Sequence, residues 1–113
     1  MLNSKLMKLN LHTALTEKSI FCYELNSLHS QTIEPDPAQL LGQQISEGLL
    51  PAGIYLFMQK RSENPLNQAE WLEMAIEQQK DGLWERHKPG NLLYVRFLFE
   101  DEANVTQVFR PAL

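Results

Sequence analysis

The chain has 113 residues, of which 43% are hydrophobic and 21% charged, so it falls within the range of folded domains and outside the disordered and fibrous classes. At this length we expect one domain over residues 1–113, which can bury about 65% of the surface that the unfolded chain exposes. Fourteen acidic against ten basic side chains give a net charge of −4, which argues against a dedicated nucleic-acid binder.

Two strands are predicted in the first part of the chain. Met7–Thr13 alternates apolar and polar residues, the period of a strand with one dry face and one wet face. Residues 20–23 are rich in β-formers and favour a second strand, although Phe21, Leu25 and Leu28 also fit a helical spacing.

A first helix of about three turns is predicted over residues 36–47. Asp36 and Pro37 are the residue types preferred at the N-cap and the first helical position, and Gln39 can bond back to the cap. Gly48 is typical of the residue that ends a helix. The apolar residues on one side of this segment are Leu40, Leu41 and Ile45.

A second helix has stronger signals. Asn67 at the N-cap and Glu70 three residues later form a capping box, and Leu66 and Trp71 have the spacing of a hydrophobic staple. Gly82 is predicted to end the helix. One side of the helix carries Trp71, Leu72, Ala75, Ile76, Gln79 and Leu83, and the opposite side carries Glu70, Glu73 and Glu77.

Ile54–Met58 and Leu92–Phe99 are apolar on both alternating faces, apart from Arg96. Such strands belong in the middle of a sheet or have their second face covered by a helix or a partner. Val105–Phe109 also has strand composition, and it is predicted to form a β-hairpin with Leu92–Phe99.

The predicted order is therefore β-β-α-β-α-β-β, an α+β domain with a mainly antiparallel sheet of about five strands, hairpins at both ends and two helices on one face. Two helices cover only one face of such a sheet. The other face, if as apolar as it reads, is a patch larger than monomers tolerate, so we expect a homodimer.

The expected compartment is the cytoplasm. Cys22 has no second cysteine with which to form an internal disulfide, and residues 1–11 place lysines among leucines where a signal peptide needs a continuous apolar run. The longest apolar stretches, such as Ile54–Met58, are much shorter than the roughly 20 residues that cross a bilayer. We expect no membrane span.

No catalytic residue, metal or cofactor is predicted. His12, Cys22, His29 and His87 form none of the short spacings that place two metal ligands on one element, although a site assembled from scattered ligands stays open. The five glycines form no phosphate-binding motif. Cys22 lies between Phe21 and Tyr23, where a buried thiol is inert.

Arg96 interrupts an apolar strand, so its guanidinium has to find a carboxylate or anion or reach water. One interpretation is an ion pair within the protein, for example with Glu24. The other is a cavity in which Arg96, Tyr94 and Tyr55 hold a polar ligand. Trp84 and Arg86 lie in a polar, basic segment, where Trp84 covers either the edge of the core or a partner surface.

The segment 50–57, LPAGIYLF, is followed by a helix carrying Trp71 and by a pair of strands. This half of the chain resembles the gyrase-inhibitor-like effector-binding domains, the small-molecule-binding domains of bacterial regulators. The family has two β-α-β-β units, whereas the first half of this chain reads β-β-α. The resemblance implies a cleft between the helices that binds small aromatic or amphipathic compounds, with Tyr55, Trp71 and Tyr94 near it.

Two functions follow from these observations. The first is a non-catalytic interaction module that pairs with itself and binds a small ligand or a protein, but neither nucleic acid nor membrane. The alternative is a small enzyme with a pocket on the sheet, in which Arg96 clamps an anion and a Tyr or His is the acid or base.

Overall fold

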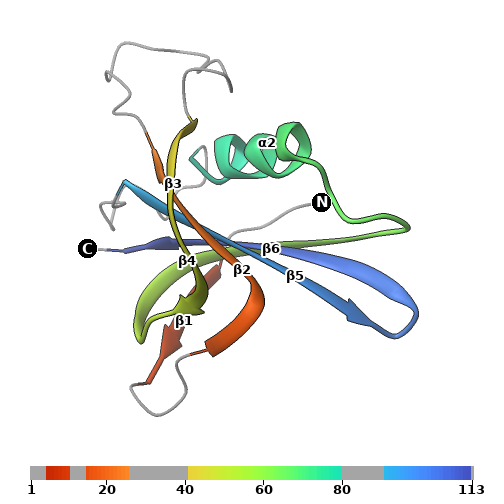
Figure 1. The fold of residues 1–113 in the computed structure, drawn as a ribbon, viewed down its shortest axis with the longest axis horizontal. Helices are drawn as coiled ribbons and strands as arrows, with labels where there is room; N and C mark the ends of the chain where they lie inside the picture. The colour runs from red at the N-terminus through yellow and green to blue at the C-terminus, as the bar shows by residue number, and fades with distance from the viewer. Residues whose placement is uncertain (1–4, 11–14, 26–40, 80–90, 113) are drawn as a thin grey trace.

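The computed structural model describes residues 5–10, 15–25, 41–79 and 91–112, which form six strands and one helix (Figure 1). In chain order these are β1 (Lys5–Leu9), β2 (Leu15–Leu25), β3 (Leu41–Leu50), β4 (Gly53–Ser62), α2 (Gln68–Gln79), β5 (Leu92–Glu100) and β6 (Ala103–Pro111).

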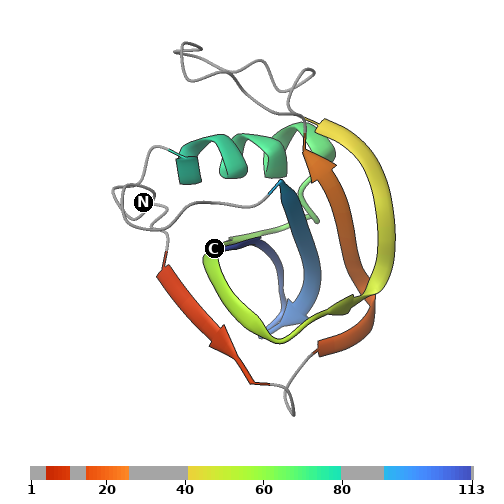
Figure 2. The same ribbon diagram turned by 90° about the vertical axis from the view of Figure 1, so that its left-hand side faces the viewer.

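The six strands form one curled sheet in the order β1-β4-β6-β5-β2-β3, in which neighbouring strands are antiparallel (Figure 2). We call the face that packs against α2 the outer face and the opposite one the inner face. A single inner cluster receives apolar side chains from all six strands, which a flat sheet could not bring together. Its buried members are Ile20, Cys22, Leu50, Tyr55, Tyr94 and Phe109.

The helix α2 begins as the sequence predicts. The backbone N–H of Glu70 donates to Asn67 Oδ1 at 2.9 Å, and the N–H of Asn67 donates to Glu70 Oε1 at 3.1 Å, which is the predicted capping box. Leu66 and Trp71, the predicted staple, are both buried between the helix and the sheet, in a set of apolar side chains that we call the outer cluster. Its buried members are Leu25, Met58, Leu66, Trp71, Leu72, Met74, Ala75, Leu93, Val95 and Val108. Gly82, the predicted end of the helix, lies outside the described residues.

We expect replacement of Asn67 by alanine to lower the free energy of unfolding by about 1 kcal/mol, because the substitution leaves the Glu70 amide without its side-chain acceptor. Asn67→Ser keeps an acceptor and should cost only a few tenths of a kcal/mol. Urea denaturation of the two variants measures the difference, and equal losses would show that the cap contributes nothing.

The buried side of α2 is only partly the predicted one. Trp71, Leu72 and Ala75 are buried and the three glutamates are exposed, as predicted. However, Met74 and Gln78 are also buried, whereas Ile76 is only partly buried. The helix is therefore rotated about its axis relative to the predicted orientation. It packs against the outer face of both β4 and β6, so its buried side is wider than the single apolar stripe that the sequence indicated.

The predicted first helix is wrong. Residues 41–50 form the strand β3, which pairs with β2, and Ile45 is 48% exposed instead of packed on a helical core face. Helical propensity is a weak preference, and here pairing with a buried neighbouring strand overrides it. The predicted cap residues Asp36, Pro37 and Gln39 lie outside the described part of the chain.

The predicted fold class is wrong in a second respect, because the described residues form a sheet of six strands in which β1 and β2 are not neighbours, so they do not form the predicted N-terminal hairpin. β1 pairs with β4, and β2 lies between β5 and β3. Ile20 and Cys22 of β2 are at most 1% exposed, which requires a place inside the sheet. For Phe21 and Leu25 the strand interpretation is confirmed over the helical one.

The predicted strands 54–58, 92–99 and 105–109 are confirmed within β4, β5 and β6. The predicted first strand, Met7–Thr13, is confirmed only in part, because β1 spans Lys5–Leu9, Asn10 is not in a strand and residues 11–13 lie outside the described residues. β4 and β5, apolar on both faces, are interior strands. β5 and β6 form the predicted hairpin, whose two-residue turn has positive φ at Asp101 (50°) and Glu102 (62°), the conformation that suits the twist of a tight hairpin.

The outer face carries α2 and the inner face is covered by the curl of the sheet itself, so the premise of the predicted dimer, a wholly uncovered apolar face, does not apply. The exposed large apolar side chains lie on β1, β3, β4 and β5; they are Leu6, Ile45, Leu49, Ile54 and Phe99. No helix among the described residues is long and apolar enough to cross a membrane.

Candidate functional site

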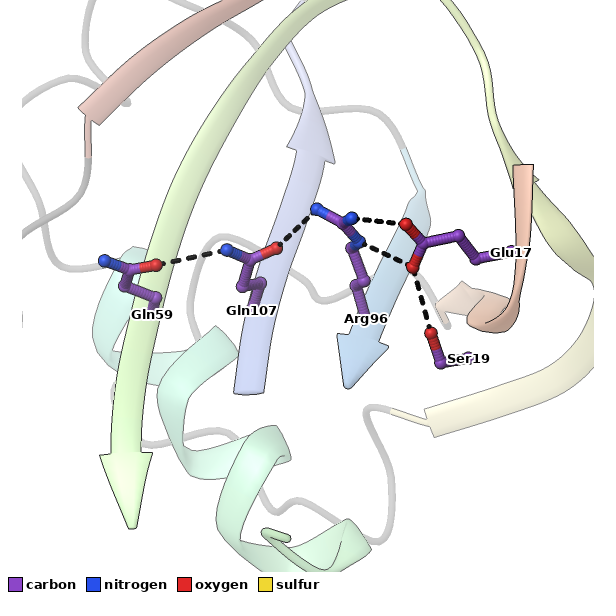
Figure 3. A network of polar contacts seen from close by, with 5 residues as sticks. All are labelled: Glu17, Ser19, Gln59, Arg96 and Gln107. Atoms are coloured by element: carbon purple, nitrogen blue, oxygen red, sulfur yellow. Dashed lines mark hydrogen bonds and ion pairs between the residues drawn. The ribbon is translucent and has the colours of Figure 1, made fainter. Parts of the chain in front are cut away.

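A row of polar side chains crosses four strands on the inner face (Figure 3). Gln59 of β4 lies opposite Gln107 of β6, and Gln107 lies opposite Arg96 of β5. Gln107 Nε2 donates to Gln59 Oε1 at 3.1 Å, and Arg96 Nη1 donates to Gln107 Oε1 at 3.3 Å. We call these three residues and Glu17 of β2 the polar row.

The row ends in a two-contact ion pair. Arg96 Nε lies 3.1 Å from Glu17 Oε2, and Arg96 Nη2 lies 2.5 Å from Glu17 Oε1. The Ser19 hydroxyl also donates to Glu17 Oε2, at 3.2 Å. Such paired contacts fix the orientation of the guanidinium plane and also bring the two opposite charges together.

An irregularity in β2 places Glu17 at this point. Thr16 lies opposite Leu49, and the next aligned pair is Phe21 with Glu47, so on the β3 side only Gly48 stands against residues 17–20. On the other side, Ile20 pairs with Arg96 of β5. Gly48 has φ of +88°, a left-handed conformation that β-carbon-bearing residues rarely adopt. Bulges of this kind redirect side chains, and here the carboxylate of Glu17 is aimed across the sheet at Arg96.

The hydrogen bond and charge of Arg96 dominate the electrostatics of the pair. The hydrogen bond from Arg96 lowers the pKa of Glu17 below its usual value against a smaller opposing effect of burial, with further lowering by the arginine charge and by Ser19. Arg96 is 16% exposed and Glu17 is 36% exposed. The Glu17 carboxylate is therefore ionised at neutral pH, and the pair reaches solvent on the Glu17 side.

Next to the polar row, tyrosines and a thiol fill the inner face. Tyr55 and Tyr94 contact each other edge to face at 5.9 Å between ring centroids, and the Tyr55 hydroxyl donates to the Pro51 carbonyl at 2.5 Å. Cys22 lies opposite Tyr94 across the strands, and burial raises the pKa of its thiol. A buried neutral thiol is a poor nucleophile.

All three tyrosines of the protein should resist ionisation in the folded state. Burial raises the pKa of Tyr55 to about 12 and raises those of Tyr94 and Tyr23 as well. Because these folded-state pKa values lie above the unfolded value of about 10, the folded state loses stability as pH rises above about 10. We expect absorbance at 295 nm to stay low at pH 10.5 and to rise together with loss of the circular dichroism signal. Gradual tyrosinate formation in the folded protein would contradict this expectation.

The structure brings three of the four predicted ligand-binding residues to one face. Tyr55, Tyr94 and Arg96 all lie on the inner face, whereas Trp71 lies on the outer face and packs against Tyr23 at 5.0 Å between ring centroids. The ion-pair partner of Arg96 is Glu17, not the suggested Glu24. The predicted interaction residues Trp84 and Arg86 lie outside the described residues.

The sequence interpretation missed Glu17, Gln59 and Gln107. Gln107 had a usable signal, because it shares the alternation of Val105 and Phe109 and so had to point to the same inner face. Glu17 had none, since it lies in a polar stretch that reads as a connection and reaches Arg96 only through the irregular part of β2.

The described residues contain no group of three or more His, Cys, Asp or Glu side chains that could hold a metal ion. His12, His29 and His87 lie outside the described residues. No protein-family model, curated protein or solved structure matches the chain.

Proposed function

We propose that the chain is a non-catalytic binding module whose inner face takes a small amphipathic molecule. The observation that carries the proposal is the polar row, a line of hydrogen-bonding side chains on an apolar face. On the same face, the partly buried Met7, Leu9 and Phe57 pack against the inner cluster. Small-molecule sites combine apolar walls with a few placed polar groups in this way.

One feature favours binding over catalysis. The Tyr55 hydroxyl donates to a backbone carbonyl and has a pKa of about 12, which is far from the value of a general acid or base at neutral pH.

The probe for this proposal is 1-anilinonaphthalene-8-sulfonate, an aromatic anion that fluoresces in apolar surroundings. We expect saturable fluorescence with the folded protein, and binding weaker by about 3- to 10-fold in Gln59→Leu, which removes one polar-row side chain. Gln68→Leu, an exposed glutamine on α2, is the matched control and should bind as the wild type does.

Near-ultraviolet circular dichroism must show native packing in each variant, because loosely packed states also bind this dye. Unsaturable fluorescence, or equal affinity in Gln59→Leu and the wild type, would refute the inner face as the binding site.

Self-association is a second candidate, and the edge strand β3 supports it. β3 ends the sheet, and Ile45 and Leu49 are 48% and 47% exposed on it. Exposed apolar edge strands tend to pair with another chain. Sedimentation should then show a concentration-dependent dimer that Ile45→Glu dissociates, and a wild type that stays monomeric at all concentrations would end this candidate.

We also propose the cytoplasm as the compartment. The support is the free, buried thiol of Cys22, since unpaired cysteines are typical of a reducing environment.

A further inference from the structure

We propose that Arg96 is a receptor for a carboxylate group of the ligand, and that Glu17 occupies this receptor until the ligand displaces it. The inference rests on the proposed function, because it names the chemical group that the inner face recognises. It concerns a monocarboxylate with an apolar tail rather than a phosphate.

The geometry of Arg96 is that of a carboxylate receptor. Its Nε and Nη2 atoms point side by side at the two oxygens of Glu17, the planar arrangement in which arginine recognises a carboxylate. We call this pair of nitrogen donors the fork, which is closed when Glu17 binds it and open when Glu17 has left. Phosphate can use the same fork, but the surrounding inner face is apolar and suits a singly charged group with a hydrocarbon tail.

The guanidinium of Arg96 has a second support besides Glu17. Arg96 Nη1 is held by Gln107 Oε1, and Gln107 is held in turn by Gln59. Gln107 is 9% exposed and lies between two β-strands, so it anchors the guanidinium from the side opposite to Glu17. A receptor with this support remains oriented when its occupant leaves.

Glu17, by contrast, is free to move. Its side chain is 36% exposed, against 16% for that of Arg96, and Ser19 is the other described side chain that donates to its carboxylate. It lies in the stretch 17–20, which has no regular pairing with β3, so rotation of its side chain disturbs no aligned pair of β2 and β3. When displaced it enters water, where a carboxylate is well solvated.

Exchange of one carboxylate for another conserves charge and hydrogen bonds. The ligand forms the contacts that Glu17 gives up, and a partly exposed ion pair contributes little net stability. The free energy of exchanging one carboxylate for the other is therefore close to zero. Contact of the hydrocarbon tail with the partly buried Phe57 and Leu98 then favours the ligand.

Glu17 therefore lowers the apparent affinity for a carboxylate, because only the fraction of molecules with an open fork can bind. Removal of its carboxylate should raise that affinity. If Glu17 closes the fork in about 80–90% of molecules, the gain is about 5- to 10-fold.

The experiment is an NMR titration with sodium acetate at constant ionic strength that follows the Nε–Hε resonance of Arg96. This resonance is assigned as the one that disappears from the spectrum of Arg96→Lys. We expect Glu17→Gln to bind acetate about 5- to 10-fold more tightly than the wild type. Glu73→Gln, which makes the same charge change on the exposed side of α2, should match the wild type. Hexanoate should bind more tightly than acetate, whereas inorganic phosphate should not bind more tightly than acetate.

Equal acetate affinity in Glu17→Gln and the wild type would overturn the inference and leave the pair a structural contact. Tighter phosphate than hexanoate binding would overturn the choice of a carboxylate. Glu17→Ala provides the same comparison if Glu17→Gln does not fold. The dye titration separates the two proposals. If the dye binds saturably but Glu17→Gln does not bind acetate more tightly, the carboxylate receptor is refuted and the binding module is not. If the protein does not bind the dye, the binding module itself is refuted.

Discussion

Replacement of Phe109 by alanine is expected to lower the free energy of unfolding by about 3–5 kcal/mol, the range for truncation of a buried aromatic side chain. Phe109 is 1% exposed on β6 and lies between the rings of Tyr55 and Phe57, at 6.0 and 5.0 Å between centroids. Its loss leaves a cavity that opposing strands of the curl cannot collapse into without breaking their pairing.

The matched control is Phe99→Ala on β5. Phe99 is 70% exposed, so its truncation should change stability by less than about 0.5 kcal/mol. Urea denaturation followed by tyrosine and tryptophan fluorescence measures both variants. Similar losses in the two would mean that the inner face is not a packed core.

Truncation of Trp71 should have a comparable effect on the opposite face, about 3–5 kcal/mol for Trp71→Ala. Trp71 is 4% exposed, belongs to the outer cluster with Met58 and Val108, and packs against Tyr23. It anchors α2 on the sheet, so the variant should also lose helical signal at lower denaturant concentrations than the wild type.

Glu73→Ala is the control for this helix, because Glu73 is exposed on the side of α2 away from the sheet. We expect a change of less than about 0.5 kcal/mol. A larger loss in Glu73→Ala than in Trp71→Ala, measured by the same denaturation, would mean that the helix faces the other way.

The sequence by itself determined the features whose causes are local. The start of α2 depends on Asn67 and Glu70, three residues apart, and their reciprocal hydrogen bonds need nothing from the rest of the chain. The hairpin of β5 and β6 has a similarly short-range cause, a polar turn between two runs of β-formers. The apolar faces of β4 and β5 indicated interior strands for the same reason.

Only the tertiary structure decided which strands are neighbours. A period of two residues is common to all strands and contains no information on pairing, so nothing local in residues 5–9 indicates that their partner is β4. Residues 41–50 combine helical and strand features, and the choice between them depended on β2, whose buried Ile20 and Cys22 required a sheet on both sides.

The polar row shows the same division. The sequence determined that Arg96, surrounded by apolar residues, needs a partner, because a buried guanidinium without one is too costly. It could not determine that the partner is Glu17, which is 79 residues away in the chain. That contact depends on the curl of the sheet and on the irregular stretch of β2 opposite Gly48, and both arise only when distant segments pack together.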